Sequence, residues 1–347
     1  MLQQSYLTAW LKAMALWLAP FKLHVLQPAL SLYTVLRNLQ TTQESAYYLE
    51  EPLLLSLGST GLVFKLSDAI VVKKSRLGRN NNIADEQRIF AILNRQPLSP
   101  YIIQHFHNTQ DAIFLEFMPG GNLGTILNDE QVRDESTPRV TRVEKLQLAQ
   151  DCLRWMRQVA AAAAWLERLG LAHCDIRPAN MLLSDARNIR LADFDHARKV
   201  GDTLPSLTEP FARLLGDEGG SERGTYGTAG CRTEQFAIGS VAYALTRGHD
   251  PYEDEWWGPD HGPICQSKLQ NMEFPGLGKG RWDNIIEDCW HGRYESIAQL
   301  SGRLSRLDHQ CSREVIEQQA SVLEIGSRKQ ECEMLVQNGV LEKLFTC

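Results

Sequence analysis

The first half of the chain alternates short apolar runs with turn residues, a pattern that predicts a sheet and one helix. The apolar runs are rich in Leu, Val, Ile and Phe and are bounded by Gly, Asp and Asn. Ile83–Asn94 instead has its apolar residues at roughly helical spacing. The predicted strands are two within Leu53–Leu66, then Ala69–Lys73, Tyr101–Phe106 and Ala112–Phe117.

From Pro119 onward the pattern predicts mainly helices. Pro119, Gly120 and Gly121 break the chain directly after the last predicted strand. The length of 347 residues suggests two domains or one bilobal domain. The predicted helices are Glu144–Leu169, Thr233–Thr246 and Trp282–Trp290, with two further helical patches around Glu314–Leu323 and Glu331–Leu344.

Composition narrows the range of partners and locations. The formal net charge of −6 argues against a nucleic-acid partner. The eight cysteines are scattered and none forms a C-x-x-C pair, so no zinc or redox motif is visible. This scatter is typical of a reducing compartment, and we expect a cytoplasmic location.

The N-terminal region Ser5–Leu39 is rich in Leu, Ala and Trp. Its longest uncharged run, Ala13–Phe21, is too short to span a bilayer, and no basic leader precedes it. We therefore expect residues 1–50 to form a helical extension docked on the protein. An interfacial membrane helix is the alternative that this composition leaves open.

The strongest chemical signal is the stretch H-C-D-I-R-P-A-N-M-L-L, His173 to Leu183, followed by L-A-D-F-D, Leu191 to Asp195. Asp175 and Asn180 lie on one short loop, and Asp193 follows on a nearby turn. Phosphoryl transfer from ATP needs such a set: one carboxylate for the attacking hydroxyl, and oxygen ligands for the magnesium ions that bridge the phosphates. We expect Asp175 to have the first role, and Asn180 and Asp193 to have the second.

At these residues the sequence resembles the eukaryotic protein kinase family, with its H-R-D-x-x-x-x-N and D-F-G motifs. Thr233–Ser240, T-E-Q-F-A-I-G-S, is similar to a motif of divergent fungal protein-kinase-like domains. The resemblance implies an α+β bilobal fold, with ATP and Mg²⁺ as cofactors. It implies a kinase-like domain at 51–308, with a β-rich lobe at 51–118 and a mainly helical lobe at 119–308, before a helical tail at 309–347.

The resemblance also assigns the nucleotide site. Its phosphate-covering loop falls on Gly58 and Gly61, whose register to the family's three glycines is ambiguous, followed by Val63. Glycines there let backbone amides approach the phosphates. The segment before the Pro-Gly-Gly break, with Glu116 and Met118, is expected to line the nucleotide cleft.

Lys73 closes the strand I-V-V-K and is expected to contact the α and β phosphates. Lys74 points to the opposite face of that strand. Glu86, on the next helix, is expected to pair with Lys73, whereas Asp85 lies about 100° around the helix. Arg177 replaces a lysine that contacts the γ-phosphate in Ser/Thr kinases and keeps the positive charge.

Two residues depart from the family pattern beside the catalytic residues. Cys174 replaces an arginine that commonly binds a phosphorylated activation loop, so we expect activity that does not depend on such phosphorylation; Arg198 or Arg223 could substitute for the lost base. Asp195 replaces the glycine of D-F-G, and we expect it to stiffen a turn whose angles favour glycine. A role for Asp195 as an additional metal ligand stays open.

The A-P-E motif of the family is absent. Glu234 aligns with the aspartate that begins the central helix and holds the catalytic loop through backbone amides. The spacer before it, which forms the platform for a peptide substrate, is expected to have collapsed, and Arg293 is expected to lack its glutamate partner.

Three functions fit these features. The first is a protein Ser/Thr kinase acting on a protein substrate, which the complete set of catalytic side chains favours. The second is an inactive pseudokinase that binds a partner protein, which the departures from the motifs favour. The third is a small-molecule phosphotransferase of the aminoglycoside or choline kinase type.

Overall fold

The computed structural model describes residues 52–58, 61–75, 82–307 and 322–344. The chain divides into two compact units, and almost all described residues belong to the second, Leu53–Cys347. The predicted extension at 1–50 lies outside the described residues. In the described part of the chain, no helix combines the length and the apolar content needed to cross a membrane.

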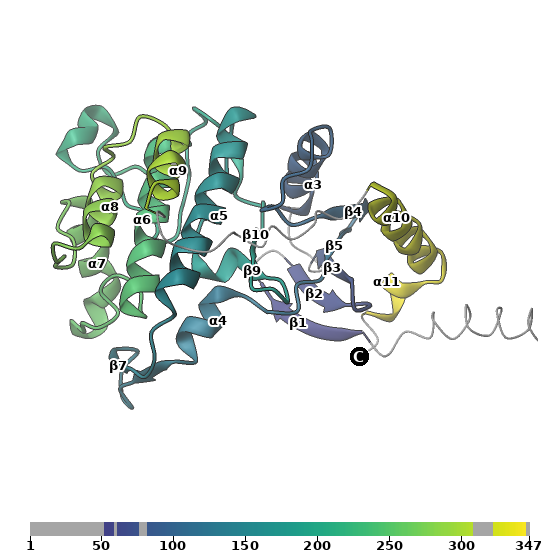
Figure 1. The fold of residues 1–347 in the computed structure, drawn as a ribbon, viewed down its shortest axis with the longest axis horizontal. Helices are drawn as coiled ribbons and strands as arrows, with labels where there is room; N and C mark the ends of the chain where they lie inside the picture. The colour runs from purple at the N-terminus through teal and green to yellow at the C-terminus, as the bar shows by residue number, and fades with distance from the viewer. Residues whose placement is uncertain (1–51, 59–60, 76–81, 308–321, 345–347) are drawn as a thin grey trace, which may run out of the picture. The chain divides into compact units, whose positions relative to one another are not determined.

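The small lobe is built on one antiparallel sheet of five strands in the order β1-β2-β3-β5-β4, with the helix α3, Asn82–Leu93, beside it (Figure 1). The central strand β3 is apolar and β-branched up to its two lysines, as a strand buried on both faces requires. The strands are β1 Leu53–Leu57, β2 Gly61–Lys65, β3 Ile70–Ser75, β4 His105–Asn108 and β5 Ala112–Glu116.

The predicted strand at Tyr101–Phe106 is wrong in its first half, because β4 begins only at His105. The residues before it contact the large lobe instead. Ile102 forms a parallel bridge with Leu191, and the amide of Ile103 donates to the carbonyl of Leu191 at 3.1 Å. These backbone bonds connect the two lobes close to the turn that carries Asp193.

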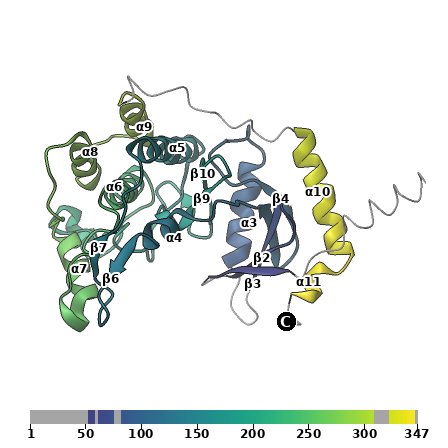
Figure 2. The ribbon, with the colours of Figure 1, turned by 60° about the horizontal axis from the view of Figure 1, so that its bottom comes forward.

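The large lobe is mainly helical and carries a few short strand pairs (Figure 2). Its helices are α4 Leu123–Asn128, α5 Ala149–Arg168, α6 Cys231–Arg247, α7 His261–Gln270, α8 Arg281–Trp290 and α9 Ile297–Ser305. Its strands are β6 Gln131–Arg133, β7 Val140–Val143, β8 Leu171–Ala172, β9 Met181–Leu183, β10 Ile189–Leu191 and β11 Arg198–Lys199, and its 3-10 turns are Pro178–Asn180, Asp217–Glu222 and Gly258–Asp260.

The predicted helix Glu144–Leu169 is too long at its start, because α5 begins at Ala149. The residues just before Glu144 form β7, which pairs with β6 as a hairpin. Trp155 and the run Ala162–Ala164 lie buried in the core, so small side chains let neighbouring elements pack closely against α5.

Two C-terminal helices, α10 Val322–Gln337 and α11 Val340–Lys343, contact the small lobe. Both views place α10 alongside β4 (Figures 1 and 2). Gly339 lies between the two helices with φ 72°, a left-handed conformation that favours glycine. Most of the predicted patch Glu314–Leu323 falls outside the described residues, and the patch Glu331–Leu344 is helical.

The helices α6 and α8 pack closely at Gly239. A Cβ atom on Gly239 would lie 2.6 Å from the Cβ of Cys289, and the next residue, Ser240, accepts a hydrogen bond from the indole of Trp290 at 3.0 Å. Both partners in α8 are fully buried. Gly239 is therefore a contact point that sets the separation of the two helices.

We expect Gly239→Ala to lower the free energy of unfolding by about 1–3 kcal/mol, because overpacking forces core atoms to move. Gly302→Ala is the matched control, because a Cβ on Gly302 in α9 meets no atom within 4 Å. This control should raise stability by up to about 1 kcal/mol through helix propensity alone. Urea unfolding of both variants measures the difference, and equal stabilities would contradict the packing argument.

Candidate active site

A buried lysine and two carboxylates form the centre of the site. Lys73 on β3 is only 8% exposed, and its Nζ lies 2.7 Å from Glu86 Oε2 on α3 and 2.5 Å from Asp193 Oδ1. Burial alone would lower the pKa of Lys73, but the charges of Glu86 and Asp193 outweigh burial and raise it. The ammonium therefore stays protonated and joins β3, α3 and the Asp193 turn.

The choice between neighbouring residues follows the sequence expectation. Lys74 points to the other face of β3, where its Nζ lies 3.1 Å from Asp111 Oδ2. Asp85 pairs with Arg88 along the exposed side of α3, whereas Glu86 is fully buried. Strand and helix periodicity thus place Lys73 and Glu86 on the faces that meet between β3 and α3.

An aromatic column runs from β4 to the catalytic loop, which we define as His173–Asn180. The ring centroids of His105 and Phe90 lie 4.9 Å apart, those of Phe90 and Phe194 lie 5.4 Å apart, and those of Phe194 and His173 lie 4.8 Å apart. The amide of Phe194 also donates to Glu86 Oε1 at 3.1 Å. The sequence analysis missed His105, because it lies at the start of a strand that was placed too early.

The catalytic loop brings three predicted residues together. The amide group of Asn180 donates to Asp175 Oδ2 at 2.7 Å and to the carbonyl of Asp175 at 2.9 Å. Arg177 Nε lies 3.2 Å from the same carboxylate oxygen. Because Asp175 is 5% exposed and accepts from both neighbours, its orientation is fixed before any substrate arrives.

Asp193 provides a more open carboxylate than Asp175. Its side chain is 35% exposed, and its backbone adopts φ 67°, a left-handed conformation that is rare outside glycine. In the described part of the chain no three His, Cys, Asp or Glu side chains converge as a metal cage. Asn180 and Asp193 offer oxygen ligands, which suits Mg²⁺, an ion that takes its other ligands from phosphates and water.

The expectation for Asp195 is wrong in its backbone argument. The left-handed residue of this turn is Asp193, and Asp195 does not adopt a positive φ. Instead the carboxylate of Asp195 is buried and lies 2.7 Å from His196 Nδ1, a hydrogen bond that raises the pKa of His196. The replacement of glycine therefore adds a side-chain contact rather than backbone strain.

Glu234, the fourth residue of α6, holds the catalytic loop through the backbone amides of that loop. Its Oε2 accepts from the amide of His173 at 2.8 Å, and its Oε1 accepts from the amide of Cys174 at 3.0 Å. This is the contact that the alignment predicted for Glu234. Cys174 has φ 64°, so the two amides converge on one carboxylate where the chain turns sharply.

Cys174 lies in a small apolar cluster. Its buried neighbours are Ala172, Leu204 and Ala229, with Leu207 and Tyr226 packed against them. Burial raises the pKa of the thiol, so it stays neutral. Where the family has a charged arginine, this chain attaches the segment after the Asp193 turn through apolar contact.

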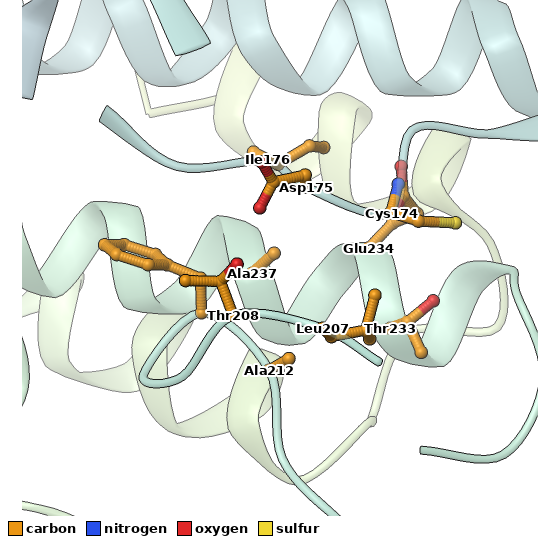
Figure 3. Close-up of a pocket in the computed structure, with 10 residues that line it drawn as sticks. Cys174, Asp175, Ile176, Leu207, Thr208, Ala212, Thr233, Glu234 and Ala237 are labelled. Carbon is orange, nitrogen blue, oxygen red and sulfur yellow. The ribbon is translucent and has the colours of Figure 1, made fainter. Parts of the chain in front are cut away.

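A small pocket lies beside Asp175, and the collapse of the spacer before Glu234 stays a prediction. Figure 3 shows Asp175 and Cys174 across this pocket from Leu207 and Thr208, with Glu234 and Ala237 of α6 between them. Leu207, Thr208 and Ala212 thus lie beside the catalytic loop. They precede, along the chain, the region that aligns with the family's A-P-E motif. Thr208 lines this pocket and is a site residue that no sequence motif singles out.

Arg293 pairs with carboxylates close to it in the sequence. Its guanidinium lies 2.7 Å from Asp288 and 3.4 Å from Glu287 on α8, at an exposed position. The pair is therefore a surface contact of small energetic value.

The residues predicted to line the nucleotide site lie at the β1–β2 turn, on β2 and β5 and in the segment that follows β5, and their roles stay predictions. Gly58 and Gly61 lie on either side of the β1–β2 turn, and a Cβ on Gly61 would lie 2.7 Å from the carbonyl of Lys74, so β2 and β3 require glycine there. Val63 pairs with Lys73 in the ladder, and Met118 is buried. The carboxylate of Glu116 faces Arg190, with Arg190 Nε 3.6 Å from Glu116 Oε2.

Burial raises the pKa of Glu234 to about 7, although the amides of His173 and Cys174 lower it. In the unfolded chain this carboxyl titrates near 4.5. Because the folded pKa is higher, the contribution of this group to stability is fully present below about pH 4.5 and is lost as the pH rises through about 7.

We therefore expect the unfolding free energy of the native protein, relative to Glu234→Gln, to fall by about 3 kcal/mol between those pH values. Urea unfolding across this range measures it, with the exposed Glu342→Gln as the control. Parallel pH profiles for the native protein and Glu234→Gln would contradict the assignment.

Comparison with known proteins agrees with this geometry. The family model for the protein kinase domain matches residues 57–269. The chain is 25% identical to serine/threonine-protein kinase mos of Xenopus laevis, over 74% of this chain and 75% of that protein. It is 25% identical to smooth muscle myosin light chain kinase of Gallus gallus, over 63% of this chain and 11% of that protein.

The chain is also similar to a bacterial kinase. The probable serine/threonine-protein kinase PknB of Bifidobacterium longum is 24% identical over 54% of this chain and 27% of that protein. The chain thus spans only a small part of some relatives and most of one, and the similarity to a fungal group stays a prediction. Since the family model covers most of the chain, including Lys73, Asp175 and Asp193, the chain belongs to the protein kinase family.

Proposed function

We propose that this chain is an active protein kinase that transfers the γ-phosphoryl group of ATP to serine or threonine hydroxyls of a protein. The observation that carries the proposal is the assembled set of side chains. Lys73, Glu86 and Asp193 contact one another, and Asp175 is oriented by Asn180 and Arg177. Arg177 keeps the positive charge of the lysine that Ser/Thr kinases have at this position, and the names of two relatives describe Ser/Thr kinases.

Each residue has a distinct role in this proposal. Lys73 binds the α and β phosphates while Glu86 holds its ammonium in place. Asp193 and Asn180 would hold Mg²⁺, which neutralises charge on the phosphates when bound. Asp175 orients the substrate hydroxyl through a carboxylate oxygen.

Phosphoryl transfer forms one bond and breaks one bond at the γ-phosphorus. The hydroxyl oxygen forms a bond to the γ-phosphorus, and the bond from that phosphorus to the β,γ-bridging oxygen breaks. ADP leaves with the electron pair, and the hydroxyl proton passes to Asp175. Arg177 lies beside Asp175, and its positive charge would stabilise the negative charge of the transferred phosphoryl group.

We expect Asp175→Asn to lower kcat by at least about 100-fold, because it removes the proton acceptor. Binding of ATP should stay nearly unchanged. Asp193→Asn should also weaken magnesium-dependent ATP binding, because it removes a metal ligand. Turnover and calorimetric binding measure these effects, with the exposed Asp185→Asn as control, and native-like turnover in both site variants would contradict the assignment.

Failure of the native protein to bind ATP would favour the alternative of a pseudokinase. A thermal unfolding series with millimolar ATP, with and without magnesium, decides this point, because a ligand that binds only the folded state raises its stability. The proposal requires an upward shift that depends on magnesium.

We also expect turnover to be independent of phosphorylation of the segment after Asp193. Cys174 offers an apolar contact rather than a charge to that segment. Treatment of the purified protein with a phosphatase should therefore change turnover by less than about twofold. A phosphate-activated kinase in the same reaction is the control, and a drop of about tenfold, or 1.4 kcal/mol of barrier, would contradict the expectation.

A further inference from the structure

Strand β3 carries two consecutive buried lysines that face opposite sides of the sheet. Lys73 faces α3 and the catalytic residues, and Lys74 faces the C-terminal helices. Lys74 is 7% exposed in its side chain, and its Nζ donates to the carbonyl of Leu341 at 3.3 Å besides its contact with Asp111. Lysine is almost never buried unless it is paired, so the contact with Leu341 is part of what permits this position.

The C-terminal helices cover that side with apolar groups. Cys332, Leu335 and Val340 are nearly or fully buried. On the sheet, Val72 and Phe114 are fully buried, and they lie on the same side as Lys74 because the ladder pairs Val72 with Phe114 and strand side chains alternate. The helix pair therefore packs as part of the small lobe.

The same helix pair contacts two strands that lead to the active site, β3 and β4. Through Leu341 it contacts β3, one residue from Lys73. Through α10 it contacts β4, whose His105 ends the aromatic column that continues to Phe194 beside Asp193. A shift of either strand would move groups that must be placed within about 1 Å for efficient chemistry.

We propose that α10 and α11 are a positioning element of the active site, and that Lys74 is the positioning residue through which they hold β3 and hence Lys73. The part of this inference that concerns nucleotide affinity rests on the proposed function. The occupant of the outer sheet face is the C-terminal segment of the same chain. Its release by a partner or by truncation would weaken ATP binding without touching the catalytic loop.

Two variants test the contact from its two sides. Val340→Asp places a carboxylate in the buried face of α11, and Asn338→Asp places the same group at an exposed position two residues away as its control. Lys74→Met removes the donor, and Lys74→Arg keeps a donor as its conservative counterpart. All four are made in the full chain.

The first readout needs no nucleotide. Acetylation of the Lys73 amine by acetic anhydride, followed by mass spectrometry, reports whether Lys73 leaves its contacts with Glu86 and Asp193. We expect Val340→Asp and Lys74→Met to accelerate this labelling by about tenfold, with the two control variants near the native rate.

The second readout is the ATP dissociation constant, with KM and kcat where turnover is present. The two disruptive variants should weaken ATP binding by about fivefold to tenfold and leave kcat at saturating ATP within about twofold, since Asp175 is untouched. A lowered melting temperature with native labelling of Lys73 and native ATP affinity would show that the helices support stability alone, and would overturn the inference.

The outcomes separate the two proposals. If the native chain binds no ATP but Val340→Asp exposes Lys73, the positioning role stands and the proposed function fails. If the native chain transfers phosphate and labelling is unchanged in both variants, the positioning role fails and the function stands. If Val340→Asp does not fold, Lys74→Met against Lys74→Arg decides.

Discussion

The buried contact between Lys73, Glu86 and Asp193 is the interaction on which the rest of this site depends. It joins a strand and the helix that follows it to a turn 120 residues farther along the chain than Lys73, and it does so with charges that would be very costly to bury alone. Removal of either carboxylate would leave the ammonium poorly compensated. The contact therefore fixes the relative placement of β3, α3 and the turn before any nucleotide is considered.

The large lobe solves a different problem, which is to hold a sharply turned loop in one conformation. Glu234 accepts two amides of that loop, and Asn180 binds both the carboxylate and the carbonyl of Asp175. Three of these four hydrogen bonds have a carboxyl oxygen as acceptor, and bonds to an ionised carboxylate are stronger than bonds between neutral groups. The catalytic loop is therefore preorganised by its own backbone and by one residue of α6.

Local patterns predicted the parts of this protein that depend on local periodicity. The strands around Lys73 and the inward face of α3 followed from alternation and helical spacing, and the contact of Glu234 was implied by the resemblance to the kinase family. The β6–β7 hairpin and the late start of β4 did not follow, because tertiary contacts such as the bridge from Ile102 to Leu191 override weak local preferences. The contact of Lys74 with Leu341 spans 267 residues, and no local pattern encodes such a separation.

The apolar surroundings of Cys174 have a consequence for how the site responds to its environment. Attachment of a segment through an arginine and a phosphate is electrostatic and weakens as salt screens the charges. Attachment through Leu204, Leu207 and Ala229 depends on apolar burial, which salt does not screen and which loses strength on cooling. This apolar part of the attachment therefore responds to temperature, where a contact between arginine and phosphate would respond to ionic strength.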